Sequence, residues 1–306
     1  MPNKQNFKSI FFIFIVRIYT NIIGSITKFI NFKFYYNFLS LFLFVVPKNI
    51  QSKIKIDDDS FFCFYLDDPY YVRFFYEKFH YEEEIFELLN LLKNKKIFFL
   101  DCGANYGYWS ILASSKRLGK QKAISVEPLK SNFKILKKNN QLNNNRIKLY
   151  NYALGKKNGK GIIYFNNNTS SNVGASLNSA NNNENNKEIV KITTIDNIIS
   201  KYKKKEIVIK LDVEGHEEAC LEGAKKTLKY NPLLIYEDHG NDKKCKVSRY
   251  LLKSNFKIFY FFNKKFIRVR KLKQINQIKK KSNKGYNFFA TKSLKYIKIL
   301  EMHNKC

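Results

Sequence analysis

The chain has 306 residues, of which 44% are hydrophobic and 16% aromatic, with only 12 glycines and 5 prolines. These figures exclude a disordered, collagen-like or proline-rich chain and predict a globular body with a sizeable core. The formal net charge is +31, so the position of the charge along the chain decides which partners it favours.

The positive charge is concentrated at the two ends of the chain. Residues 1–55 hold eight basic and no acidic residues, and residues 243–306 hold twenty basic residues and one acidic residue. The basic residues are 49 Lys and only seven Arg, whereas proteins that read nucleic acids rely on the bidentate Arg fork. A compositional drift toward A/T-rich codons explains much of this excess of Lys, so nucleic acid is disfavoured as a partner.

The N-terminal segment, residues 1–56, is basic and rich in Phe and Ile. Its two apolar runs, residues 10–16 and 38–46, stop at Arg17 and Pro47, and each is shorter than the roughly 20 residues of a membrane span. Two interpretations stay open: helices lying on an anionic membrane surface, or helices packed on the globular domain. The first would place the chain peripherally at the inner membrane surface.

From residue 57 to about residue 300 the pattern predicts a single domain. A helix ends near Lys93 and a short buried strand follows at residues 97–100. Helices at 108–117 and 129–141 then alternate with strands at 123–127 and 147–152, which predicts a parallel sheet with helices on both faces.

The rest of the domain continues this alternation after a less regular stretch. A short hairpin is expected near residues 161–165, and an Asn-rich loop covers 166–186, either a plain insertion or a mobile lid. A strand runs into a helix at 207–217, another strand lies at 232–240, and two closing strands are expected at 256–262 and 286–292. The five cysteines form no CxxC pair, which indicates a reducing, cytoplasmic setting.

The first candidate site is the segment DCGANYGYWS, residues 101–110, between the first strand and its helix. Gly103 and Gly107 permit a tight turn and a close approach of a ligand, and Asp101 ends the strand where open parallel sheets bind ligands. Glu127 ends the next strand and is placed to accept both hydroxyls of a ribose. The GxGxxG pattern of nicotinamide sites is absent, and Asp101 before the turn suits the amino group of S-adenosylmethionine.

The second candidate site is the segment KLDVEGHE, residues 210–217, at the end of a later strand. Asp212, Glu214 and His216 would face the Gly turn if the sheet is parallel. They could orient a substrate, take a proton from a hydroxyl or hold a metal, although two carboxylates alone do not define a metal site. The alternative is that Glu214 and His216 cap the next helix. Residues 237–239 form a third group that either lines the substrate side or has a structural role.

Together these segments resemble the FkbM family of methyltransferases. The resemblance is carried by LDCGANYGYWS, SVEPLKSNFKILKKN, NYALG, TTIDNII, LDVEGHEEACLEGAKKTL and PLLIYE, in the family's order over residues 97–238. It implies a class I methyltransferase (Rossmann-like) fold, with a seven-stranded, mostly parallel sheet and one antiparallel strand near its end. It also implies S-adenosylmethionine as the cofactor.

The resemblance assigns roles to individual residues. It implies a reaction centre formed by Asp212, Glu214 and His216. It implies cofactor contacts from Asp101, Gly103, Ala104, Asn105, Gly107, Glu127 and Ala153, with Glu127 on the ribose and Ala153 along the adenine.

The expected activity is transfer of a methyl group to a hydroxyl oxygen of a sugar, a glycan or a related metabolite, as in the modification of surface polysaccharides. His216 or Glu214 would act as the base and Asp212 would orient the acceptor. The Asn/Asp-Pro-Pro-aromatic turn of base methyltransferases is absent, but ribose O-methylation of RNA stays an alternative. The last alternative is a non-catalytic protein that binds membranes or nucleic acid through its basic termini.

Overall fold

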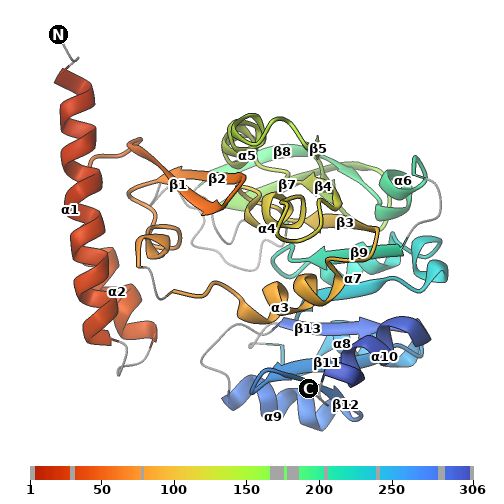
Figure 1. Ribbon diagram of the computed structural model, residues 1–306. Coiled ribbons are helices and arrows are strands. Elements are labelled where there is room, and N and C mark those ends of the chain that lie inside the picture. Colours follow the sequence, from red (N-terminus) through yellow and green to blue (C-terminus); the bar gives the residue numbers. More distant parts are fainter. Residues whose placement is uncertain are drawn as a thin grey trace.

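The computed structural model describes residues 4–27, 32–76, 79–165, 176–177, 186–202, 206–238, 242–281 and 287–303. These residues form an α/β domain with a helix pair at one edge (Figure 1). The α-helices are α1 (Lys4–Thr27), α2 (Phe32–Leu43), α3 (Glu83–Leu92), α4 (Tyr108–Ala113), α5 (Lys130–Leu142), α6 (Ile195–Ile199), α7 (Glu217–Glu222), α8 (Lys246–Lys253), α9 (Leu272–Lys281) and α10 (Leu294–Met302). Two short 3-10 helices are η1 (Val72–Phe75) and η2 (Thr227–Tyr230).

The described strands form three sheets. The strands are β1 (Gln51–Asp57), β2 (Ser60–Tyr65), β3 (Ile97–Cys102), β4 (Lys122–Val126), β5 (Ile147–Tyr150), β6 (Ala153–Leu154), β7 (Gly159–Phe165), β8 (Asn186–Thr193), β9 (Glu206–Leu211), β10 (Leu233–Glu237), β11 (Lys257–Phe262), β12 (Lys265–Val269) and β13 (Asn287–Thr291). The main sheet has the order β12-β11-β13-β10-β9-β3-β4-β5, and the small sheets are β1-β2 and β6-β8-β7.

The main sheet confirms the predicted fold class, with a correction to the strand count. Strands β10, β9, β3, β4 and β5 pair in parallel, and β13 lies antiparallel between β10 and β11. The described residues include an eighth strand, β12, which pairs antiparallel with β11 at the edge. The prediction missed it because its five residues, KFIRV, are short and include two basic side chains, which gives a weak strand pattern.

The main sheet separates two hydrophobic cores, as expected for helices on both faces. Along β3 the side chain of Phe99 enters one core, while Phe98 and Leu100 enter the other. Along β9, Val208 and Ile209 divide in the same way. Because neighbouring strand residues point to opposite faces, a continuous apolar strand is what a sheet covered on both sides requires. Helices α3, α4, α5 and α10 contribute to the first core, and α6, α7, α8 and α9 to the second.

The hairpin β1–β2 was not predicted, and the expected domain boundary after residue 56 falls inside β1, which pairs antiparallel with β2. Two side-chain amides, one on α5 and one at its C-cap, bind the outer edge of β2. Asn139 bonds with the backbone N–H and C=O of Cys63 at 2.7 and 2.9 Å, and Asn143 bonds with those of Phe61 at 2.9 and 2.7 Å. Four residues along a helix and two along a strand both advance by about 6 Å, so the two spacings match.

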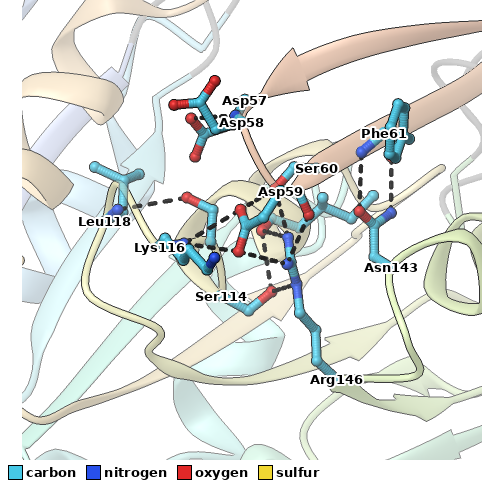
Figure 2. A network of polar contacts seen from close by, with 12 residues as sticks. Asp57, Asp58, Asp59, Ser60, Phe61, Ser114, Lys116, Leu118, Asn143 and Arg146 are labelled. Atoms are coloured by element: carbon cyan, nitrogen blue, oxygen red, sulfur yellow. Dashed lines mark hydrogen bonds and ion pairs between the residues drawn. The ribbon is translucent and has the colours of Figure 1, made fainter.

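Arg146 completes the attachment of the hairpin (Figure 2). Its guanidinium donates to Ser60 Oγ at 2.6 Å, to the backbone oxygen of Asp59 at 3.1 Å and to Ser114 Oγ at 2.9 Å, and it pairs with the Asp59 carboxylate at 3.3 Å. The hairpin is thereby tied to α4 and to the chain that follows α5.

The N-terminal helix α1 has 24 residues and continues past Arg17 to Thr27, although the sequence analysis treated Arg17 as the end of an apolar run. Residues Lys8–Ser25 have a mean hydropathy of 1.3, so by length and composition alone α1 could cross a membrane. One side of α1 packs on the protein: Tyr19 stacks on Phe42 of α2 with ring centroids 4.0 Å apart, and Asn21 donates to the backbone oxygen of Phe75 at 2.9 Å.

Candidate active site

A pocket lies at the carboxyl ends of β3, β4 and β9, the edge at which open parallel sheets bind ligands. Nine of the ten predicted site residues line it: Asp101, Gly103, Ala104, Asn105, Glu127, Ala153, Asp212, Glu214 and His216. The tenth, Gly107, is not among the lining residues. It is the N-cap of α4 with a φ of 86°, and a Cβ there would lie 2.4 Å from Leu136 Cδ1. Gly107 therefore allows the turn to pack closely on α5.

Gly103 brings the two predicted segments together. Its φ is +76°, and a Cβ at this position would lie 1.8 Å from the backbone oxygen of Asp212. Only glycine allows this approach. In addition, the backbone N–H of Asp212 donates to the backbone oxygen of Cys102 at 3.1 Å. The turn after β3 and the turn after β9 therefore form one wall of the pocket.

Asp101 is 1% exposed at the end of β3. Its Oδ2 accepts a hydrogen bond from Ser110 Oγ at 2.7 Å, and Ser110 Oγ in turn accepts one from Ser125 Oγ at 2.7 Å. Burial raises the pKa of the Asp101 carboxyl, while the charge of Lys210 and the bond from Ser110 oppose this. The second oxygen, Oδ1, is buried and has no hydrogen-bond partner among the described residues.

Lys210 is a buried cation that the sequence analysis did not single out. It pairs in register with Asp101 across β3 and β9, and its Nζ lies 2.7 Å from Asp212 Oδ2. Burial alone would lower the pKa of Lys210, but the carboxylates of Asp212 and Asp101 outweigh this and raise it above its ordinary value. Lys210 is therefore charged and holds Asp212 in place, while the Asp212 side chain stays 30% exposed toward the pocket.

Glu127 follows β4 directly and is 4% exposed. Its Oε2 accepts the backbone N–H of Asn105 at 2.9 Å, and its Oε1 accepts that of Leu129 at 3.1 Å. Burial raises the pKa of Glu127 to about 7, although these backbone bonds oppose the rise. The Glu127 carboxylate is thus oriented by two backbone amides, and it lines the pocket, where an ionised carboxylate can accept hydrogen bonds from a ligand.

The turn after β9 is held by Glu217, another residue that the sequence analysis did not assign. Its Oε1 accepts the backbone N–H groups of Val213 and Gly215, both at 3.1 Å. Glu214 between them has a φ of 50°, in the left-handed region. The alternative that His216 caps α7 through its side chain is not observed: His216 occupies the N-cap position, but its imidazole makes no capping bond.

His216 is half-buried beside the pocket. Burial lowers its pKa below the ordinary value of 6.5, against the opposing charge of Glu217. Its imidazole is therefore neutral at physiological pH and can accept a proton. Gly155 lies next to it, since a Cβ at Gly155 would be 3.6 Å from His216 Nε2.

An aromatic wall faces this turn, formed by Tyr70, Tyr81, Tyr108 and Trp109. Tyr70 and Tyr81 share a hydrogen bond between their hydroxyls at 2.5 Å, and Arg73 holds Tyr70 from behind, with its guanidinium 4.4 Å from the ring centroid. Burial and the charge of Glu82 raise the pKa of Tyr70. These hydroxyls are therefore neutral. The sequence analysis missed this wall, because in a chain with 20 Tyr and 28 Phe the aromatic residues of a site cannot be distinguished from those of the core.

Two other expectations of the sequence analysis are resolved in part. Asp238 is 1% exposed and bonds to Lys279 Nζ and Ser248 Oγ, each at 2.5 Å, so it fastens α8 and α9 and does not line the pocket. His239 lies outside the described residues. Of the Asn-rich loop, Ser176 and Leu177 are described ahead of β8. Leu177 lines the pocket, and Ser176 Oγ donates to the backbone oxygen of Glu214 at 2.7 Å.

Among the residues that the structure describes, no group of three or more His, Cys, Asp or Glu side chains is arranged to hold a metal ion. The fit of a nucleoside cofactor rests on two buried acceptors. The oxygens Asp101 Oδ1 and Asn105 Oδ1 have no partner in the described part of the chain, and such acceptors suit the amino group of S-adenosylmethionine. The two oriented oxygens of Glu127 suit its ribose hydroxyls.

Comparison with known proteins gives one family match. The model of the methyltransferase FkbM domain matches residues 101–272, more than half of the chain. No curated protein sequence matches significantly.

Solved structures of similar fold include an FkbM methyltransferase from Methylobacillus flagellatus, with 17% identity over 63% of this chain and a TM-score of 0.42. This chain spans only 42% of that protein. Others are an S-adenosylmethionine-dependent O-methyltransferase from Thermotoga maritima (11% identity, 70% and 66% of the two chains, TM-score 0.37) and a Bacillus cereus O-methyltransferase in complex with S-adenosylhomocysteine (10%, 70% and 82%, 0.36). From the family match, the chain belongs to the FkbM methyltransferase family, and its cofactor is S-adenosylmethionine.

Proposed function

We propose that the protein transfers the methyl group of S-adenosylmethionine to a hydroxyl oxygen of a sugar or glycan, or of a related small metabolite. The observation that carries the proposal is His216, a half-buried imidazole with a lowered pKa beside the pocket. A hydroxyl becomes a good nucleophile only as its proton leaves, so a neutral base next to the acceptor accelerates the transfer.

The reaction needs few groups from the protein. Bound S-adenosylmethionine supplies an electrophilic methyl group on a sulfonium that is already a good leaving group. With the cofactor bound, His216 would take the proton of the acceptor hydroxyl on an imidazole nitrogen, which makes the acceptor oxygen nucleophilic enough to receive the methyl group. Asp212, fixed by Lys210 at 2.7 Å, accepts a hydrogen bond from the acceptor and orients it.

The aromatic wall supports a sugar acceptor. Tyr70, Tyr81 and Trp109 line the same pocket as Asp212 and His216. A pyranose ring has an apolar face of C–H groups that packs on aromatic rings, and hydroxyls at its edge that need acceptors such as Asp212. The reaction would belong to polysaccharide modification. We also propose a cytoplasmic location, since Cys63, Cys102, Cys220 and Cys245 are all buried and unpaired.

The test is methyl transfer from labelled S-adenosylmethionine to a panel of sugars, oligosaccharides and RNA, with the wild type and His216→Gln. We expect transfer to a saccharide hydroxyl, and a kcat about 10² to 10⁴ times lower in the variant. The affinity for S-adenosylhomocysteine should stay within twofold. His303→Gln, at the far end of α10, is the matched control and should keep full activity.

The pH profile separates a base from a structural residue. Because the pKa of His216 lies below 6.5, kcat/KM for the acceptor, measured at saturating S-adenosylmethionine, should be constant above neutral pH and fall as the pH drops through that pKa. Transfer to RNA ribose and to none of the saccharides would overturn the acceptor assignment, and an unchanged kcat in His216→Gln would overturn the role of the base.

A further inference from the structure

The exposed apolar side chains of this protein are concentrated at its N-terminal end. Of the fifteen large hydrophobic residues that are exposed in the described part of the chain, nine lie between residues 10 and 45. They are Ile10, Phe11, Phe14, Ile18 and Ile22 on α1, and Phe38, Leu41, Phe44 and Val45 on and directly after α2. Phe44 is 90% exposed and Leu41 77%. Figure 1 shows the helix pair α1 and α2 at one edge of the molecule, away from the main sheet.

The exposed residues of α1 form a stripe. At about 100° per residue, Ile10, Phe14 and Ile22 fall within a sector of roughly 120° of the helix surface. Phe11 and Ile18 lie in the same sector. Lys8 and Arg17, both exposed, lie at the two borders of the sector. An apolar stripe flanked by basic residues is typical of helices that lie in the plane of a membrane surface.

Other side chains of α1 attach the helix to the domain, which argues against a helix that crosses the membrane. Val16 is fully buried, Asn21 donates to the backbone oxygen of Phe75, and Gly24 packs against Tyr76 so closely that a Cβ would lie 2.7 Å from the ring. A spanning orientation would have to break these contacts. With α1 docked, its free stripe can enter a membrane surface and its length of about 36 Å can lie along it.

The charge of the segment selects the partner. Residues 1–55 include eight basic and no acidic side chains. A second copy of this chain would bring the same positive charge to the interface and repel the first, whereas an anionic lipid surface attracts it. We propose that the helix pair α1–α2 docks the protein onto an anionic membrane surface, with the apolar stripe among the acyl chains. The inference does not depend on the proposed acceptor.

The experiment is flotation of the full-length protein with two kinds of vesicle. One contains phosphatidylcholine alone, and the other also contains about 30% phosphatidylglycerol to give it an anionic surface. We expect binding to the anionic vesicles that weakens about fivefold in each of Lys8→Gln and Arg17→Gln. The stripe variant Phe11→Ser/Phe14→Ser/Ile18→Ser should lower the affinity at least tenfold. Its matched control is Ile189→Ser/Phe262→Ser/Leu294→Ser, which removes three exposed apolar residues elsewhere and should bind as the wild type does.

Other outcomes would overturn the proposal. Equal vesicle binding by the stripe variant and its control would show that the stripe does not contact the membrane. Protein that resists extraction at alkaline pH would show that α1 crosses the membrane. If the wild type does not bind vesicles but forms dimers in sedimentation velocity, and the stripe variant is monomeric, the stripe would be covered by a second copy of the chain.

Discussion

The two walls of the pocket are built in different ways. On the cofactor side, Asp101 is the last but one residue of β3 and Glu127 directly follows the adjacent parallel strand β4, and backbone amides or a serine hydroxyl fix their carboxylates. On the aromatic side, Tyr70 and Tyr81 come from the chain between β2 and α3, and their hydroxyls bond to each other. The cofactor wall therefore has buried acceptor oxygens with no partner in the described part of the chain, whereas the aromatic wall has hydroxyls that are already paired with each other.

This difference indicates a division of roles. A site for one fixed ligand benefits from rigid acceptors at strand ends, because the sheet positions them to within a fraction of an ångström. An acceptor site can be formed by side chains that pack on one another and need no common motif. If the two walls act separately, substitutions in one should leave binding at the other unchanged.

The largest effect on ligand binding should come from Asp101→Asn. The variant keeps the shape of the side chain but places an amide N–H₂ where a ligand amino group needs an acceptor, and it removes a charged hydrogen bond of about 1.5–3 kcal/mol. We expect the affinity for S-adenosylhomocysteine, measured by calorimetry, to fall about 10- to 100-fold. Asp58→Asn, whose parent side chain is 95% exposed, is the control. Unchanged affinity in Asp101→Asn would show that this carboxylate does not contact the cofactor.

A smaller effect should follow from the protonation of Glu127. Burial raises its pKa to about 7, and only the ionised carboxylate accepts hydrogen bonds on both oxygens from ribose hydroxyls. The affinity for S-adenosylhomocysteine should therefore rise about tenfold between pH 6 and pH 8 and then level off. Calorimetry across this range tests the prediction. A Glu127→Gln variant should bind weakly at both pH values, and a variant that keeps the pH dependence would contradict the assignment.

The smallest effect is expected on the aromatic wall. Tyr70→Phe keeps the ring and Tyr70→Leu removes it, so the pair separates the aromatic face from the hydroxyl. Relative to the wild type, KM for the acceptor should rise about three- to tenfold in Tyr70→Leu, in line with one lost aromatic contact, and less in Tyr70→Phe. Binding of S-adenosylhomocysteine should stay within twofold in both. A large loss of cofactor affinity in Tyr70→Leu would show that the two walls are coupled.

The sequence predicted the cofactor wall well for a physical reason. Gly103 and Glu127 directly follow strand ends, and Asp101 is the last but one residue of β3, so a change from apolar to small or acidic residues is visible in the pattern. Lys210 holds the same position in β9, but it was missed because a lone cation there resembles an irregular strand position. Its role appears only when β3 and β9 pair in register and place it beside Asp101 and Asp212.

Tertiary contacts explain the other differences. The hairpin β1–β2 is held by Arg146 and by the side-chain amides of Asn139 and Asn143, more than 70 residues away in the chain. Local sequence patterns therefore do not predict it. Helix α1 shows the opposite case, since a single Arg17 at the border of an apolar stripe looked like the end of an apolar segment. Along the helix surface it is a flanking charge.

Asn139 on α5 and Asn143 at its C-cap also cover the exposed edge of the hairpin β1–β2. A hairpin with a free outer edge is a template on which another chain can add a strand, and this is a common route to aggregation. Asn139 and Asn143 occupy the backbone donors and acceptors of Cys63 and Phe61 on that edge. These two amides therefore block the addition of a further strand at Cys63 and Phe61.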